Sequence, residues 1–241
     1  MAETKYLIVN ADDFGQSPGV NRGVIRAYEQ GIVTSASLMV RWPYAAEAAA
    51  YAKAHPELSL GLHLDLGEWA FRDGEWVCLY EVVSPSDETA VADELARQLD
   101  SFRQLTGKDP THLDSHQHVH RDEPLRSMMV DLAEKLCIPL RDFSSSVSYC
   151  GNFYGQSAEG CPYPEAISVE GLITTLEPLP IGVTELGCHP AERDDLEGMY
   201  RAERRQELKA LCDPRIRAAL ADLEIELTSF DDLKAGAAVL T

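Results

Sequence analysis

The sequence predicts an α/β protein in which parallel strands alternate with helices. Strand-like and helix-like segments alternate along the chain, and charged residues gather where several of the strands end. The length of 241 residues suits one domain over 1–241, because α/β barrels of this size fold as a single unit. The sequence contains no internal repeat, low-complexity tract or linker that would indicate a second domain.

Seven segments carry the buried or alternating apolar pattern of strands. The first is continuous in apolar residues, as expected of a strand that is covered on both faces. The later ones are bounded by glycine, proline or polar turn residues. The seven expected strands cover residues 6–10, 34–40, 59–66, 111–119, 139–143, 183–188 and 224–230.

Helices are expected between these strands, and two of them have clear end signals. Ser17 is placed as the N-cap of the first, with Pro18 at its first position and Gly31 as its stop. Asp87 caps a longer helix, which Gly107 closes. With these two, the expected helices cover 18–30, 44–54, 87–106, 124–136, 169–177 and 199–212.

Two long segments lack periodicity and are predicted to be loops. Residues 67–86 are rich in turn formers and aromatic residues, and residues 144–167 carry Ser, Gly, Tyr and Pro. A shorter turn is expected over 11–18. Long loops inside a compact domain are more often functional than idle, so the two long segments are candidates for substrate contacts.

The composition limits the kinds of partner. Forty acidic residues against 21 basic ones give a net charge of −19, which disfavours nucleic acid as a partner. The N-terminus has no signal-peptide pattern, and no apolar run is long enough to span a membrane, so we expect neither a membrane partner nor secretion. The six cysteines are scattered without a C-x-x-C pair, which favours a reducing compartment and a cytoplasmic protein.

The segment 111–120 carries most of the chemistry. On a strand, alternate residues share a face, which would place one carboxylate and four imidazoles on the same side. Burying five such groups without partners would cost a large desolvation energy, so the pattern favours a metal-binding or catalytic role over a solvated edge strand with a chance cluster. These residues are His112, Asp114, His116, His118 and His120.

Three other segments place ionisable residues at strand ends, where parallel α/β folds bind ligands. Asp12 and Asp13 follow the first strand; the paired carboxylates suit one metal ligand and one base, or alternatively an Asx turn that caps the next helix. His63 lies in an apolar strand, where it is either a satisfied core residue or a further metal ligand. His189 precedes a proline that favours an extended backbone, which suits a pointing side chain.

Taken together, these segments resemble the YdjC-like carbohydrate deacetylases, the family of the chitooligosaccharide deacetylases. The resemblance runs from the first strand to at least the last of the motifs. The long motif of the fourth strand and the motif after the first strand are the most specific. The matching motifs are Asn10-Ala-Asp-Asp-Phe-Gly15, Ser17-Pro-Gly-Val-Asn21, Gly31-Ile-Val-Thr-Ser35, Gly61-Leu-His-Leu64, Thr111-His-Leu-Asp-Ser-His-Gln-His-Val-His120 and Cys188-His-Pro190.

The resemblance implies a fold and a site. The implied fold is a distorted seven-stranded β/α barrel related to polysaccharide deacetylases. The implied cofactor is one divalent metal ion, Mg²⁺ or Zn²⁺, held by Asp13, His63 and His116. Asp12 would act as the base, and His189 is the candidate acid. The implied activity is removal of an acetyl group from an N-acetylated amino sugar, a small carbohydrate substrate.

In the expected reaction, Asp12 takes a proton from a water activated by the metal, and His189 gives a proton to the departing amine. Asp114 and His118 are expected to orient the ligands. Aromatic residues of the two long loops are candidates for stacking on sugar rings, or are simply exposed; they are Trp69, Trp76 and Tyr154.

Two departures from the family pattern stand beside this match, and two other functions stay open. Asp65 replaces a frequent Asn, and Ala191 replaces a frequent Gly. A phosphoesterase on a similar barrel is disfavoured, because such barrels usually carry His-x-His on the first strand. A non-catalytic sugar-binding module is disfavoured by Asp12, because binding needs no base. The sequence leaves the exact sugar, the metal and the oligomeric state open, a homodimer included.

Overall fold

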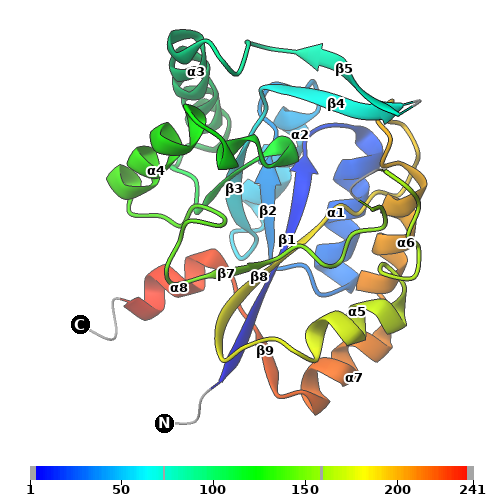
Figure 1. Ribbon diagram of the computed structural model, residues 1–241. Helices are drawn as coiled ribbons and strands as arrows, with labels where there is room; N and C mark the ends of the chain where they lie inside the picture. Colours follow the sequence, from blue (N-terminus) through cyan, green and yellow to red (C-terminus); the bar gives the residue numbers. More distant parts are fainter. Residues whose placement is uncertain (1–3, 73, 158–159, 238–241) are drawn as a thin grey trace.

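The computed structural model describes residues 4–72, 74–157 and 160–237, in which seven strands form one curled sheet (Figure 1). All the strand pairs of this sheet are parallel. The sheet order is β6-β3-β2-β1-β8-β7, with β9 paired to β1. The strands are β1 (Lys5–Phe14), β2 (Ser35–Leu38), β3 (Ser59–Leu64), β6 (Leu113–Ser115), β7 (Ser148–Cys150), β8 (Gly182–Cys188) and β9 (Ile225–Leu227).

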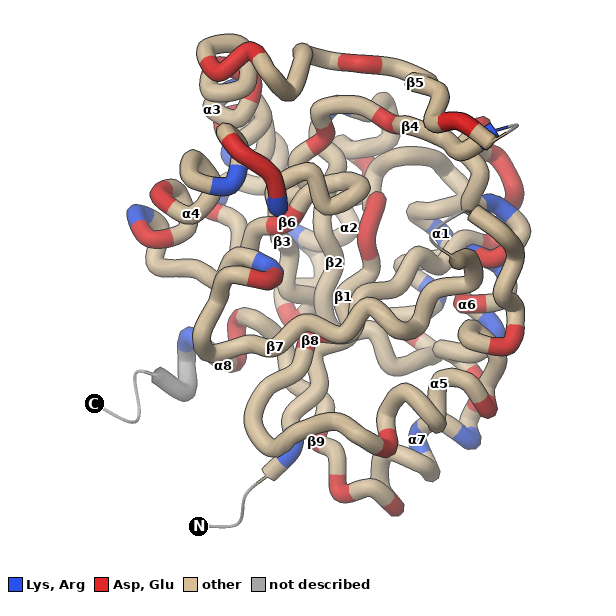
Figure 2. Tube along the Cα trace, viewed as in Figure 1, with Lys and Arg blue, Asp and Glu red and all other residues tan. Residues whose placement is uncertain are grey.

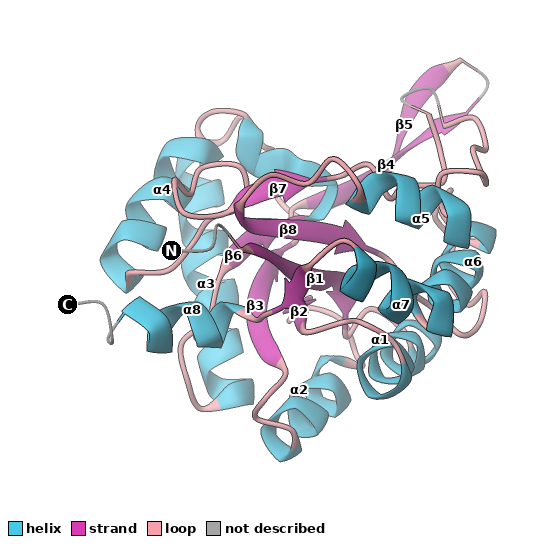
Figure 3. Cartoon of the chain, turned by 90° about the horizontal axis from the view of Figure 1, so that it is seen from below, coloured by secondary structure: helices cyan, strands magenta, loops and turns pink. Residues whose placement is uncertain are grey.

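The curl of the sheet gives an incompletely closed barrel. One edge of β1 pairs first with β9 and then, from Asn10 onward, with β2. At the edge of β6, Leu140 adds a parallel bridge to Leu113 and continues the wall beyond the last regular strand. Seen from below, the strands curve round a centre with helices outside them (Figure 3). The predicted distorted seven-stranded β/α barrel is therefore confirmed.

The helices lie outside the sheet and begin and end largely where the capping residues predict. The Ser17 side chain accepts a hydrogen bond from the backbone of Val20, and Gly107 takes the left-handed conformation with φ 76°. Within the described ranges, no helix is both long and apolar enough to cross a membrane. The helices are α1 (Pro18–Gln30), α2 (Ala45–Ala54), α3 (Glu88–Thr106), α4 (Leu125–Leu136), α5 (Val169–Leu176), α6 (Ala202–Leu211), α7 (Pro214–Asp222) and α8 (Phe230–Ala237).

The turn expected over 11–18 begins later than predicted, because β1 continues to Phe14. Its end is irregular: the register with β2 shifts between Ala11 and Phe14, and Asp13 has a φ of 66°. A bulge of this kind changes the direction of a side chain and is common beside active sites. It explains how two adjacent residues, Asp12 and Asp13, both serve one cavity although strand geometry would send them to opposite faces.

The expected strand over 111–119 is wrong beyond β6. A 3₁₀ segment, η1 (His116–Arg121), follows directly, and within it Gln117 and His118 have φ values of 51° and 54°. These left-handed residues break the alternation that would have placed four histidines on one face. As a result, each histidine of this segment has different surroundings.

Other expectations about bounds also need correction. The loop expected over 67–86 contains an antiparallel hairpin, β4 (Gly67–Arg72) and β5 (Glu75–Glu81). The loop expected over 144–167 includes β7, and the strand expected over 139–143 is reduced to the bridge at Leu140. Helix α7 was not expected, and the strand expected to reach residue 230 ends earlier because α8 begins there.

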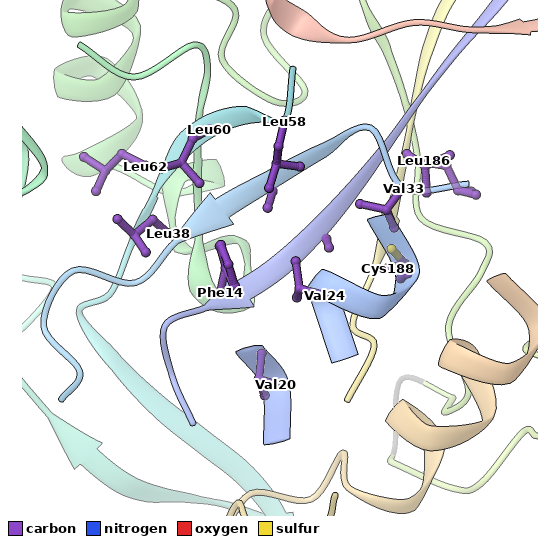
Figure 4. Close-up of a cluster of buried hydrophobic side chains, with 14 of the residues drawn as sticks. Phe14, Val20, Val24, Val33, Leu38, Leu58, Leu60, Leu62, Leu186 and Cys188 are labelled. Atoms are coloured by element: carbon purple, nitrogen blue, oxygen red, sulfur yellow. The ribbon is translucent and has the colours of Figure 1, made fainter. Parts of the chain in front are cut away.

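The two faces of β1 differ in chemistry. Leu7, Val9 and Ala11 belong to the main hydrophobic core, part of which is shown between the sheet and α1 in Figure 4. Asn10, on the other face, donates to the Ser37 hydroxyl at 2.8 Å inside the barrel. The hydrophobic face of β1 therefore packs against the helices, and the polar face lies inside the barrel and leads to the site.

Helix α1 lies very close to the chain that follows β8. A Cβ atom added at Gly23 would lie 2.4 Å from the Cα of Ala191 and 2.6 Å from the carbonyl oxygen of Pro190. Real Cβ atoms do not approach backbone this closely, so Gly23 sets the distance between α1 and the His189 turn.

We expect Gly23→Ala to lower the free energy of unfolding by about 1–3 kcal/mol, because the backbone of α1 or of the turn must move. Equilibrium urea unfolding measures this change. Arg26→Ala, at an exposed position of the same helix, is the matched control and should stay within about 0.5 kcal/mol of the parent. Equal stability of Gly23→Ala and the parent would show that the helix and the turn are not in close contact.

Candidate active site and metal centre

The predicted site residues meet in a cavity at the carboxyl ends of the strands. Its volume is about 660 Å³, within the usual range for small-ligand sites. Asp12 and Asp13 come from β1, His63 from β3, His116 from the end of β6, and His189 from the end of β8. The fold thus brings all five together from four separate strands.

Three of these side chains have the spacing of metal ligands. Ligand atoms of Asp13, His63 and His116 all lie within 4.8 Å of one another. Asp13 Oδ1 is 3.3 Å from His63 Nε2 and 3.0 Å from His116 Nδ1. Two atoms bound at about 2.0–2.1 Å to one ion lie about 3.0–3.4 Å apart, so the spacing fits one divalent cation. His116 Nε2 is buried without a hydrogen-bond partner among the described residues, so a water or substrate group could bind there as well.

Further side chains orient these ligands. Asp114 Oδ1 accepts from His63 Nδ1 at 2.8 Å, which leaves Nε2 of that ring toward Asp13. A carboxylate behind a histidine in this way is typical of metal sites. Arg204 donates to Asp13 Oδ2 at 2.6 Å. Burial alone would raise the pKa of Asp13, but Arg204 and His116 hold that pKa well below its usual value, so this carboxylate is ionised.

A second arginine, Arg141, binds Asp12 and holds it beside the three candidate ligands. Arg141 Nη1 donates to its Oδ2 at 2.7 Å and Nη2 to its Oδ1 at 2.8 Å, and Asn10 donates to Oδ1 at 2.9 Å. Burial raises the pKa of Asp12, but Arg141 outweighs it and the net shift is downward. The carboxylate is therefore ionised and fixed in orientation beside the candidate ligands.

Arg141 also serves two further carboxylates. Its Nη2 lies 2.8 Å from Asp114 Oδ2 and 2.6 Å from Glu185 Oε1, and its side chain is completely buried. One guanidinium cannot neutralise three buried carboxylates. Burial raises the pKa of Glu185 to about 7, against the opposing effect of Arg141, so Glu185 is protonated below about pH 7 and adds less negative charge to this group than the other two carboxylates.

His189 is fixed in the cavity wall by its backbone and by two aromatic rings. Its backbone amide donates to Glu207, whose carboxylate also accepts from the Tyr200 hydroxyl. The ring lies edge-on to Tyr154 and Tyr200, with centroids 5.6 and 5.5 Å away. Its Nε2 is 3.8 Å from Asp12 Oδ2, so the two candidate catalytic groups face the same space.

The remaining histidines of segment 111–120 do not join the metal ligands. His112 stacks on Phe230 inside the barrel, and burial lowers its pKa to about 3. His118 lines the cavity but lies 3.5 Å from the Tyr149 hydroxyl rather than beside a ligand, so its expected orienting role is wrong. His120 binds Ser115 Oγ at 2.6 Å and the backbone oxygen of Arg141 at 3.2 Å.

The hairpin β4–β5 forms part of the cavity wall. Trp69 and Trp76 from the hairpin line the cavity together with Tyr154, as expected of sugar-stacking residues. The backbone of Trp69 donates to Gln117 Oε1 at 3.0 Å, and its carbonyl accepts from Gln117 Nε2 at 2.7 Å. Asp65, one of the two departures noted above, does not line the cavity; it anchors the hairpin by accepting from the backbone of Gly67 and from Tyr80.

Sequence reasoning missed the cations and acids that support the site. Arg141 and Arg204 were not singled out, nor were Glu68, Glu185 and Glu207. The acidic residues at the strand ends could have predicted basic partners, because several buried carboxylates require nearby cations. The sequence does not show which of its 21 basic residues supply them.

Comparison with known proteins identifies the family of this chain. The sequence profile described as YdjC-like protein matches residues 6–222. The chain belongs to the YdjC-like family. Among curated relatives, a carbohydrate deacetylase of Geobacillus stearothermophilus is 32% identical, with 94% of this chain and 97% of that protein covered. A chitooligosaccharide deacetylase of Serratia marcescens is 33% identical, covering 95% and 99%.

Solved structures place this YdjC-like chain among barrels of the same kind. A protein from Enterococcus faecalis, described as a candidate cellobiose-phosphate cleavage protein, superposes with a TM-score of 0.72 at 26% identity, covering 95% of this chain and 99% of that one. A family 4 carbohydrate esterase from Streptomyces lividans, solved with acetate, gives a TM-score of 0.54 at 14% identity, covering 92% and 91%. The second likeness shows the fold alone.

The proton on Glu185 predicts a pH dependence of stability. The folded protein keeps this proton up to about pH 7, whereas the ordinary pKa is 4.5. Its contribution to stability is fully present below about pH 4.5 and is lost as the pH rises through 7. We therefore compare the free energy of unfolding of the parent with that of Glu185→Gln. The parent value minus the variant value should decrease as the pH rises from about 5 to about 8.

Urea unfolding at the two pH values measures this difference. Glu134→Gln, at an exposed position of α4, is the control and should give a difference that does not change with pH. A difference for Glu185→Gln that is the same at both pH values would contradict a proton on this carboxyl.

Proposed function

We propose that this chain is a metal-dependent carbohydrate N-deacetylase that hydrolyses an acetamide to acetate and an amine. The observation that carries the proposal is the cluster of Asp13, His63 and His116 with the ionised Asp12 beside it, in one cavity. The donor set of one carboxylate and two imidazoles fits a single Mg²⁺ or Zn²⁺. When bound, such an ion lowers the pKa of a water and polarises the acetamide carbonyl.

Asp12 is the proposed base. Arg141 and Asn10 hold its carboxylate in place, and its lowered pKa keeps it ionised and able to accept a proton from the attacking water. Because Arg141 is bound to two other carboxylates as well, it fixes the direction of Asp12 more firmly than a single ion pair would.

His189 is the proposed acid. An amide nitrogen leaves poorly as an anion, so a proton must reach it as the C–N bond breaks. The His189 ring lies edge-on to the stacked rings of Tyr154 and Tyr200, with Nε2 on the side of Asp12. A substrate acetamide bound in the cavity beside Asp12 and His189 would therefore have the proposed base and the proposed acid on the same side.

The proposed substrate is a small carbohydrate that carries an N-acetyl group. Two curated relatives are named for carbohydrate and chitooligosaccharide deacetylation, and each matches nearly the whole chain. The cavity supports the same substrate class, because Trp69, Trp76 and Tyr154 offer aromatic faces beside polar groups.

Charge and cysteine state support the expected partners and compartment. Acidic positions are spread over helices and loops, with basic positions among them (Figure 2), which supports a neutral substrate and no nucleic-acid partner. All six cysteines are free thiols, which supports a reducing compartment such as the cytoplasm.

The two other candidate functions are less well supported. A phosphoesterase would need a second metal, and His118, His120 and Asp142 do have ligand atoms within 4.8 Å of one another. However, both ring nitrogens of His120 are already engaged by Ser115 and by the backbone of Arg141. A non-catalytic sugar-binding module would have no use for an ionised carboxylate fixed next to a metal site.

We expect Asp13→Ala and His63→Ala to reduce bound metal from one ion per chain to a small fraction and to lower acetate release more than about a hundredfold. Loss of a ligand should exceed the effect of losing an outer-shell partner, which costs about 10–100-fold. Metal analysis of the purified protein measures the first effect independently of activity. His55→Ala, in which the histidine lies at the end of α2, is the control and should keep its metal. Full metal content in Asp13→Ala would disprove the ligand assignment.

We expect Asp12→Asn to keep its metal and lose about 10²–10⁴-fold in kcat on N-acetylated chitooligosaccharides, because the amide cannot accept the proton. Acetate release and metal content are measured on the same preparation. Asp100→Asn, at a largely exposed position on α3, is the matched control. Unchanged turnover in Asp12→Asn would remove the base assignment and leave the metal site intact.

A further inference from the structure

A continuous row of buried side chains connects His63 to the interior of the barrel. Asp114 Oδ1 accepts from His63 Nδ1 at 2.8 Å, and its other oxygen, Oδ2, accepts from the Ser37 hydroxyl at 2.6 Å. Ser37 Oγ lies 3.0 Å from His112 Nε2, and Nδ1 of that ring lies 2.8 Å from the Thr111 hydroxyl. None of the five residues is more than 2% exposed. The proposed reaction gives a role to His63 and Asp114 and leaves the rest of the row without one.

The direction of each hydrogen bond in this row follows from the donors present. The Asp114 carboxylate, paired with Arg141 at 2.8 Å, can only accept, so the single Ser37 hydrogen points to it. Burial lowers the pKa of His112 to about 3, so its ring is neutral and donates from one nitrogen while the other accepts. Because the Ser37 hydrogen is already used, His112 Nε2 donates to Ser37 and Nδ1 accepts from Thr111. The row therefore fixes one tautomer of His112, with the proton on Nε2.

The fold holds the His112 ring in place behind the metal centre. The ring stacks on Phe230 with a centroid distance of 3.8 Å and an interplanar angle of 18°. It also lies against Gly61 of β3, where an added Cβ atom would come within 2.4 Å of the ring. Gly61 and His63 share a face of β3, because they are two residues apart on a strand. The ring therefore occupies the same side of β3 as the candidate ligand.

A packing role alone would not require this row. A purely apolar ring at position 112 could stack on Phe230 without the cost of burying two polar nitrogens. The hydrogen bonds of His112 lead instead, through Ser37, to the carboxylate that sets the direction of the His63 ring. Carboxylates behind a ligand histidine fix its tautomer and orientation, and the hydrogen bonds to such a carboxylate act on the same ligand.

We propose that Ser37 and His112 are positioning residues of the metal centre, in which His112 holds the Ser37 hydroxyl and this hydroxyl fixes Asp114 behind the ligand His63. The inference rests on the proposed function, because it takes His63 as a metal ligand. It gives His112 an effect on metal affinity that passes through three hydrogen bonds, from His112 to Ser37, from Ser37 to Asp114 and from His63 to Asp114.

The test measures metal affinity rather than activity. The full chain is stripped of metal with a chelator and titrated with Zn²⁺ against a competing chromophoric chelator at neutral pH. Loss of an outer-shell partner costs about 10–100-fold in metal affinity, and Ser37 and His112 act through such a partner. We therefore expect Ser37→Ala to weaken Zn²⁺ binding about tenfold, and His112→Phe, which keeps an aromatic ring beside Phe230, about threefold to tenfold.

A double-mutant cycle shows whether the two residues act in series. If His112 acts through Ser37, the protein with both changes should bind Zn²⁺ within about twofold of Ser37→Ala alone. Ser35→Ala is the matched control, because it removes another fully buried hydroxyl of β2 whose Oγ donates to the backbone oxygen of Ser59. It should leave the Zn²⁺ affinity unchanged.

Two further measurements separate positioning from packing. His112→Gln loses the ring but keeps an amide donor near the position of Nε2, so it should bind Zn²⁺ more tightly than His112→Phe. Packing alone predicts the reverse order, because the amide fills less of the space beside Phe230. Nitrogen NMR of the parent protein should show the His112 proton on Nε2, and this measurement does not depend on a variant that folds.

The other outcomes overturn separate parts of the proposal. Parent-like affinity in both Ser37→Ala and His112→Phe overturns the positioning role, as do additive losses in the double variant or a proton on Nδ1 of His112. Equal losses in Ser35→Ala and Ser37→Ala would show a general effect of packing instead. A parent that binds no Zn²⁺, or that binds it no better than His63→Ala, overturns the metal centre and this inference together. A parent that binds Zn²⁺ but releases no acetate from N-acetylated chitooligosaccharides overturns the deacetylase proposal alone.

Discussion

The guanidinium of Arg141 joins three strands at the carboxyl end of the barrel. It contacts Asp12 from β1, Asp114 from β6 and Glu185 from β8, and it packs against the ring of Tyr149 from β7 at 4.8 Å. Breaking a buried charge group of this kind costs about 3–5 kcal/mol, because the remaining charges stay buried without a partner. The position of the proposed base and the orientation of one candidate ligand histidine both depend on this cation.

Local departures from regular backbone bring the reactive groups together. The left-handed conformation of Asp13 turns two neighbouring carboxylates toward one cavity, and the left-handed pair after His116 ends β6 at the metal cluster. Conformations of this kind are sparsely populated for non-glycine residues and persist where the surrounding structure holds them. Here the hydrogen bonds of Arg204 and Gln117 supply that support.

The hairpin β4–β5 lies beside the candidate metal ligands and lines their cavity. Its strand β4 carries Trp69 and Glu68, which both line the cavity of the candidate site. Asp65 holds its base through the backbone of Gly67 and the Tyr80 hydroxyl, and it binds Arg41 at 3.1 Å. A residue that differs from the usual family pattern thus shapes the cavity walls while making no contact with the metal ligands.

The sequence by itself determined the βα order and the caps of α1 and α3, because periodicity and capping act over a few neighbouring residues. It also placed candidate ligands at strand ends, and the resemblance to a family selected Asp13, His63 and His116 among them. Only the tertiary structure decided which histidines of segment 111–120 join that cluster, that residues 67–86 form a hairpin, and that Arg141 supplies the shared cation. These outcomes depend on contacts between segments far apart in the chain. Contacts between distant segments determine where a bulge or a buried ion pair forms, so the local sequence pattern does not predict either feature.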